Sequence, residues 1–154
     1  MLKRVYLDTS VIGGCFDDEF SLWSKKLFRE FEDRRKIAVI SDLTLEELEA
    51  APVAVKVLPH KISQYALEMV SFGDKAEALA KEYIRQGVVT NLHLADAQHI
   101  AIATVEKVDV LVSWNFKQIV NLNKIHLFNA VNLKLGYPVL EIRSPREVLD
   151  EKEI

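Results

Sequence analysis

Short apolar runs bounded by polar residues recur along the chain and predict buried β-strands. They occupy residues 2–7, 36–41 and 109–114, and a similar run at 137–142 is a fourth candidate. These runs are apolar at consecutive positions, which is typical of strands in a parallel sheet that helices cover on both faces.

Between these runs, apolar residues recur every three or four positions and predict helices. Helices are expected through the twenties, over 43–52, over 74–87 and over the alanine-rich residues 92–107, with short helices in 53–72. The alternation of strands and helices predicts an α/β fold with a mostly parallel central sheet flanked by helices. In such sheets, ligands bind beyond the carboxyl ends of the strands.

The composition fits one soluble globular domain over residues 1–154, in which 137–154 form a strand followed by a short helix or tail. The net charge of −3 disfavours a global electrostatic grip on a long polyanion, so nucleic-acid contact would need a local basic patch or bound cations. The single cysteine, Cys15, excludes an internal disulfide. No apolar run approaches the roughly 18 residues of a membrane helix. We therefore expect a cytoplasmic protein without a membrane segment.

Two acids allow both a structural and a chemical interpretation. Asp8 ends the first predicted strand, so it either caps the turn that follows, with Thr9 or Ser10 sharing that role, or belongs to a site at the sheet edge. Glu47 stands three residues after Thr44, a spacing that also fits a helix-capping box. Taken singly, neither acid identifies a site.

Asp96 is more informative because it shares a helical stripe with apolar residues, namely Leu92, Ile100 and Ala103. A buried carboxylate is costly unless it is paired or bound to a cation. The alternative is that Asp96 lies in the first turn and meets the positive end of the helix dipole. His93 and His99 flank it at three-residue spacing, but they lie well apart around a helix, so we expect structural histidines rather than a transition-metal site.

Asp8, Glu47, Asp96 and Asn115 come from four elements whose ends a parallel sheet can bring together. Three carboxylates and an amide, without cysteine or histidine ligands, favour a hard cation such as Mg²⁺ or Mn²⁺. Such an ion can activate water and bridge phosphate oxygens. The glycine-rich motifs G-x-G-x-x-G and G-x-x-x-x-G-K-[ST] are absent, which excludes nucleotide binding of those kinds.

Four segments, in this order and spacing, resemble the PIN-domain family and, within it, the VapC-type toxins of toxin–antitoxin pairs: YLDTSVIGG, ISDLTLEELEAAP, ADAQHIAIAT and DVLVSWNFKQIVN. The resemblance implies a parallel sheet flanked by helices, acids that bind Mg²⁺ or Mn²⁺, and cleavage of RNA. It assigns the acids to Asp8, Glu47 and Asp96, a helper role to Ser10, and the fourth position to Asn115. Many relatives have Asp at that fourth position, so Asn115 keeps an oxygen ligand but removes a charge.

The resemblance therefore implies a metal-dependent endoribonuclease that hydrolyses RNA phosphodiesters. It further implies the toxin of a toxin–antitoxin pair, with an antitoxin protein as partner and a homodimeric state. Two alternatives stay open. One is a catalytically weak PIN-like module that binds a protein, which Asn115 and the acidic net charge favour. The other is a metal-dependent phosphohydrolase that acts on a small substrate.

Overall fold

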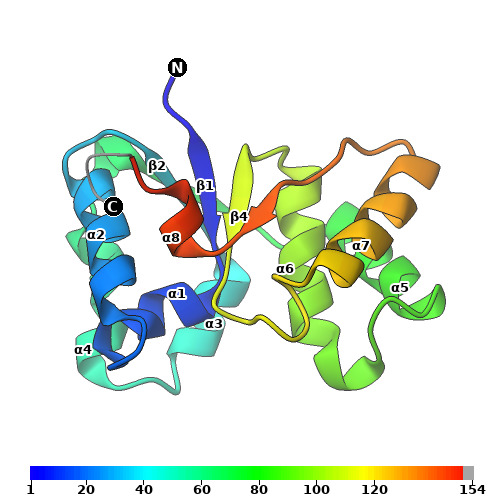
Figure 1. Ribbon diagram of the computed structural model, residues 1–154, viewed down its shortest axis with the longest axis horizontal. Coiled ribbons are helices and arrows are strands. Elements are labelled where there is room, and N and C mark those ends of the chain that lie inside the picture. The colour runs from blue at the N-terminus through cyan, green and yellow to red at the C-terminus, as the bar shows by residue number, and fades with distance from the viewer. Residues whose placement is uncertain (151–154) are drawn as a thin grey trace.

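The computed structural model describes residues 1–150 and contains a five-stranded sheet in the order β3-β2-β1-β4-β5 (Figure 1). The strands are β1 (Arg4–Leu7), β2 (Ile37–Ser41), β3 (Leu67–Val70), β4 (Val110–Val112) and β5 (Ile142–Arg143). Every neighbouring pair runs parallel, and β1 lies in the middle between β2 and β4. The predicted α/β fold with a parallel central sheet is confirmed.

Helices connect the strands and cover both faces of the sheet. They are α1 (Thr9–Gly13), α2 (Ser21–Glu32), α3 (Asp42–Leu48), α4 (Val53–Lys56), α5 (Asp74–Arg85), α6 (Leu94–Val105), α7 (Leu122–Lys134) and α8 (Pro145–Val148). In Figure 1, α1, α2 and α8 lie on one side of the sheet, and α5, α6 and α7 lie on the other. Among residues 1–150, none of the helices is both long enough and apolar enough to cross a membrane.

Successive residues of each central strand supply two different apolar cores. Tyr6, Val39 and Leu111 pack with residues of α5, α6 and α7. Their neighbours Val5 and Leu7 pack with residues of α1, α2, α3 and α4 on the opposite face. Because strand side chains alternate between faces, a sheet covered on both sides needs apolar residues at every position, which explains the continuous apolar runs.

The structure corrects several predicted boundaries. Residues 53–72 hold short helices as expected, but they also hold β3, an edge strand that the sequence prediction missed because it is only partly buried. The helix predicted over 43–52 ends at Leu48, and Pro52 instead precedes α4. The last strand is Ile142–Arg143 rather than 137–142, and α8 follows it, whereas residues 151–154 of the predicted tail lie outside the described part of the chain.

Candidate active site

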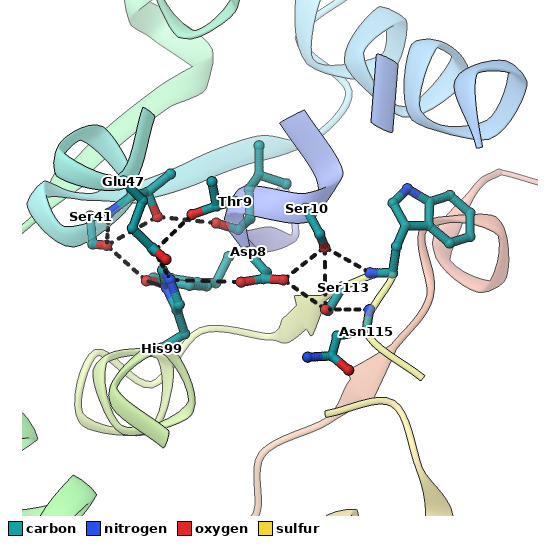
Figure 2. Close-up of polar contacts among 12 residues, drawn as sticks. Asp8, Thr9, Ser10, Ser41, Glu47, His99, Ser113 and Asn115 are labelled. Atoms are coloured by element: carbon teal, nitrogen blue, oxygen red, sulfur yellow. Dashed lines mark hydrogen bonds and ion pairs between the residues drawn. The ribbon is translucent and has the colours of Figure 1, made fainter. Parts of the chain in front are cut away.

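Asp8 directly follows the middle strand, at the carboxyl edge of the sheet, and is only 5 % exposed. It occupies the position before α1, yet its side chain makes no capping hydrogen bond. Its Oδ2 instead accepts hydrogen bonds from the hydroxyls of Ser10, at 2.7 Å, and Ser113, at 2.8 Å (Figure 2). The capping interpretation of Asp8 is therefore wrong, because hydroxyls from α1 and from the end of β4 hold the carboxylate in place.

Glu47 reaches the same region from the last turn of α3 (Figure 2). Its Oε1 accepts a hydrogen bond from Thr9 Oγ1 at 2.9 Å and is in short contact with His99 Nε2. The cap of α3 is Ser41, whose Oγ accepts from the backbone N–H of Thr44 at 3.1 Å. The capping box between Thr44 and Glu47 is therefore not formed, and the glutamate side chain is directed to the site.

His99 is 1 % exposed, and both of its ring nitrogens are bonded. Nε2 contacts Glu47 and lies 3.7 Å from Asp8 Oδ1, while Nδ1 lies 2.7 Å from the Tyr6 hydroxyl. That hydroxyl is in turn 2.8 Å from Ser41 Oγ. His99 is the satisfied structural histidine expected from the sequence, but it connects the buried end of β2 to a candidate acid, a connection that sequence spacing alone does not reveal.

The pKa values of Glu47 and His99 shift in opposite directions. Burial disfavours the charged form of each group, but their mutual hydrogen bond and the neighbouring charges outweigh burial. The pKa of the Glu47 carboxyl therefore lies below its usual value, and the pKa of the His99 imidazole lies above its usual value. Both shifts favour a carboxylate–imidazolium pair, in which Nδ1–H donates to Tyr6 Oη.

Asp96 lies in the first turn of α6, with its side chain 22 % exposed. Burial raises the pKa of this carboxyl, and the negative charges of Asp8 and Glu47 raise it further against the opposing effect of two histidines. The charges of Asp8 and Glu47 therefore act on Asp96, whose partner among the described side chains is His93, with Nδ1 3.6 Å from Oδ2. The predicted apolar stripe does not extend to Leu92, which is 91 % exposed and lies in the 3-10 turn before the helix.

Asn115 is placed next to the site but is engaged in a turn (Figure 2). Its Oδ1 accepts hydrogen bonds from the backbone N–H groups of Lys117, at 3.2 Å, and Gln118, at 3.0 Å. Its own backbone N–H donates to Ser113 Oγ at 2.9 Å, the hydroxyl that also holds Asp8. The side chain of Asn115 thus shapes the loop after β4, since both lone pairs of its amide oxygen already accept hydrogen bonds.

The donor set fits a hard divalent cation in its chemistry. Within residues 1–150, no three carboxylate, imidazole or thiol groups already surround a common point as metal ligands do. However, Glu47 Oε2 and Asp96 Oδ1 have no hydrogen-bond or ion-pair partner among the described residues. Asp8 Oδ1 lies 3.7 Å from His99 Nε2, and Asp96 Oδ2 lies 3.6 Å from His93 Nδ1. Carboxylate oxygens are the ligands that Mg²⁺ and Mn²⁺ prefer. Burial, and then the charges of Asp8 and Glu47, raise the pKa of Asp96, and a bound cation would oppose both effects.

Solved structures with the same fold include VapC20 and VapBC2. VapC20 of Mycobacterium tuberculosis, described as a toxin that cleaves the sarcin–ricin loop, has a TM-score of 0.55 and 14% identity over 88% of this chain and 98% of its own. VapBC2 of Rickettsia felis, solved with a DNA fragment from its promoter, has a TM-score of 0.52 and 16% identity over 92% of this chain and 98% of its own. Comparison with curated proteins finds no match.

A family model described as "PIN domain" matches residues 5–119, well over half of the chain. The matched part includes the end of β1, the site helices α3 and α6, and the loop after β4. It therefore contains every residue predicted for the site. The chain belongs to the PIN-domain family.

Proposed function

We propose that this protein is a divalent-metal-dependent endoribonuclease. The observation that carries the proposal is that Asp8 and Glu47, at the carboxyl edge of the sheet, both lie against His99 Nε2, and that Asp96 is near enough for their charges to raise its pKa beyond the effect of burial. Membership of the PIN family and the likeness in fold to a toxin described as cleaving the sarcin–ricin loop support the choice of RNA as the substrate. Together they favour a ribonuclease over a nuclease of other specificity.

Side chains of this chain hydrogen-bond to two of the three acids and fix their orientation. Ser10 and Ser113 donate to Oδ2 of Asp8, and its Oδ1 lies 3.7 Å from His99 Nε2. Thr9 and His99 likewise contact Oε1 of Glu47. This fixing of rotamers before the substrate arrives reduces the reorganisation needed for catalysis.

Asp8, Glu47 and Asp96 would hold Mg²⁺ or Mn²⁺. When bound, such an ion lowers the pKa of a coordinated water and neutralises charge on the scissile phosphate. Without a cation, the clustered carboxylates repel an RNA phosphate, so the free protein is expected to bind RNA poorly. Dependence on the metal thus follows from the charge of the site.

Asn115 is the weakest member of the proposed site, and Asn115→Asp tests its role. An aspartate can accept the same two backbone N–H groups while adding a charge, so we expect Mn²⁺ to bind roughly tenfold more tightly. The matched control is Asn121→Asp, because Asn121 Oδ1 likewise accepts a backbone N–H, from Lys124 at 3.1 Å, at the start of α7. Calorimetric titration that finds equal affinities for both variants and the parent would remove Asn115 from the metal's surroundings.

We further propose that the protein is the toxin of a toxin–antitoxin pair, acting in the cytoplasm as a homodimer with an antitoxin partner. The support is the shared fold with VapC20 and VapBC2, and the absence of a membrane-spanning helix in residues 1–150 is compatible with it. Expression of this chain alone in a bacterial host should arrest growth of the cells, and co-expression of the antitoxin protein should relieve the arrest.

The direct test is cleavage of total cellular RNA by the purified protein in Mg²⁺ or Mn²⁺, beside the same reaction with excess EDTA. We expect discrete fragments with metal and none with EDTA. A generic phosphatase substrate in a parallel reaction distinguishes a small-molecule phosphohydrolase. Intact RNA in every condition, from protein that binds no Mn²⁺ but is folded, would instead favour the protein-binding module.

A further inference from the structure

A hollow of about 250 Å³ lies directly beside the candidate active site. We call it the aromatic hollow; its lining includes Ser10, Gly13, Asp17, Phe20, Trp114 and Asn115. Two of these residues also touch the acidic site. The Ser10 hydroxyl donates to Asp8 and accepts from the backbone N–H of Trp114 at 3.0 Å, and Asn115 N–H donates to Ser113. A group in the hollow would therefore sit next to whatever the acids bind.

Aromatic rings form one wall of the hollow and its rim. Phe20 stacks on Trp114 with ring centroids 4.3 Å apart and planes 14° apart. Phe116 contacts both rings, with centroids at 6.4 Å and 6.1 Å, and is 49 % exposed. Trp114 is only 9 % exposed and Phe20 is partly buried, so Phe20 and Phe116 supply the accessible ring surface at the edge of the candidate active site. Apolar surface gathered beside a polar site is typical of a binding surface.

The wall is held rigidly from behind. Trp114 donates from Nε1 to Ser24 Oγ at 2.9 Å. Gly14 packs so closely against this pair that a Cβ there would lie 2.8 Å from both the Ser24 oxygen and the indole nitrogen. The fixed indole supports the stacked Phe20 ring, so Phe20 can present apolar surface with little loss of side-chain entropy when a ligand binds.

The charge of the hollow excludes phosphate and admits a neutral group. The part of its lining that the structure describes contains no Lys, Arg or His, and its one charged residue is Asp17. The Asp17 carboxylate faces backbone, accepting from the N–H groups of Glu19 and Phe20 at 2.8 Å and 3.3 Å. Asn115 and Ser10 add uncharged polar residues to the lining. Flat, uncharged rings with polar edges match this surface, and nucleobases have that chemistry.

We infer that the aromatic hollow receives the base of a nucleotide adjacent to the scissile phosphate, and so selects unpaired RNA. This inference rests on the proposed ribonuclease function. Base stacking on protein aromatic rings is tolerant of sequence but requires a base that is free of the duplex. The hollow thus gives an acidic protein a means of holding RNA that does not depend on a basic surface.

The experiment compares cleavage of short RNAs that carry the mapped cut site. One is intact, and others each lack a single base on one side of the cut. The parent should cut one of the abasic RNAs about tenfold more slowly than the intact RNA. Phe20→Leu, which keeps apolar volume but removes the ring, should cut the intact RNA about tenfold more slowly and lose the distinction between intact and abasic. Because this distinction is a ratio of rates for one protein sample, partial unfolding does not affect it.

The matched control is Phe16→Leu. Phe16 is 55 % exposed and lies in the 3-10 turn Gly14–Phe16 after α1, outside the lining of the hollow, so this variant should keep the parent's ratio. A Phe20→Leu enzyme that keeps the parent's ratio at every position overturns the inference while leaving the ribonuclease intact, and would indicate that a protein segment occupies the hollow instead. Failure of the parent to cut the intact RNA would overturn both.

Fluorescence provides a second readout that does not require Phe20→Leu to fold. The chain has two tryptophans, so Trp23→Phe leaves Trp114 as the reporter. In the non-cleaving Asp8→Asn background, the intact RNA should quench Trp114 fluorescence more strongly than the sensitive abasic RNA. Equal quenching by both would contradict stacking in the hollow.

Discussion

Asp8→Asn is expected to lower RNA cleavage by about 10³-fold or more, because it removes a charge worth several kcal/mol to the binding of a cation and to the transition state. The fold should persist, since an asparagine amide oxygen can accept the two hydroxyl hydrogen bonds that Oδ2 of Asp8 accepts from Ser10 and Ser113. Loss of the Asp8 charge also relieves repulsion of Asp96, whose pKa is raised by burial and then by Asp8. Single-turnover kinetics measure the loss of RNA cleavage, and urea unfolding measures the stability of the fold.

A structural role for Asp8 makes a different prediction, namely lower stability together with lower activity. We expect Asp8→Asn to unfold at the same urea concentration as the parent or a higher one. The control is Asp109→Asn at the amino edge of the sheet, where Asp109 Oδ2 accepts from the backbone N–H of Arg4 at 2.7 Å. This control should cut RNA at the parent's rate; if Asp8→Asn does so as well, the site assignment is wrong.

Lys36→Met is expected to produce the largest loss of stability, about 3–5 kcal/mol in the free energy of unfolding. The Lys36 side chain is 7 % exposed, and its ammonium makes close ion pairs with Glu30, which is fully buried, and with Asp150 at 2.7 Å. Removal of the cation leaves the Glu30 carboxylate buried without its partner, while Glu30 Oε2 still accepts from Asp150 N–H at 3.1 Å. The cluster ties the chain after α8 to α2, far in sequence from each other.

Two comparisons isolate the buried pair in urea unfolding. The double variant Glu30→Gln with Lys36→Met carries no buried charge at these positions and should recover most of the lost stability. Lys81→Met removes the exposed partner of Glu77, a pair 3.3 Å apart on α5, and should change stability by less than about 1 kcal/mol. Equal losses for Lys36→Met and Lys81→Met would show that the buried cluster does not stabilise the fold.

The parallel sheet could be predicted because its central strands are buried on both faces and so are apolar at every position. The edge strands β3 and β5 lack this signature. Glu68 of β3 pairs with Arg4 at 2.8 Å, and β5 has only two residues. Helix α7 was not predicted either, because few of its residues are fully buried and its apolar stripe is weak. Hydrophobic periodicity alone does not locate a short or partly exposed strand or helix.

The candidate acids were found in sequence because strand ends and small-residue helices are local features. The partners that hold them are not local. Ser113 lies 105 residues from Asp8, and His99 lies 52 residues from Glu47, so only the fold reveals their contacts. The position of His99, one turn after Asp96 on an apolar helix, is the sequence feature that could have pointed to this contact. From sequence, His99 is assigned only a structural role. The sequence therefore identifies the candidate acids, but it does not identify the side chains that hydrogen-bond to their carboxylates.

Calorimetric titration of the parent with Mn²⁺, beside Asp8→Asn, Glu47→Gln and Asp96→Asn, tests the central claim most directly. The proposed site predicts saturable binding to the parent and a large loss of affinity in each variant, with all four proteins folded. A folded parent that binds no Mn²⁺, or variants that bind it as tightly as the parent, would contradict the claim that these three carboxylates form a metal-dependent active site.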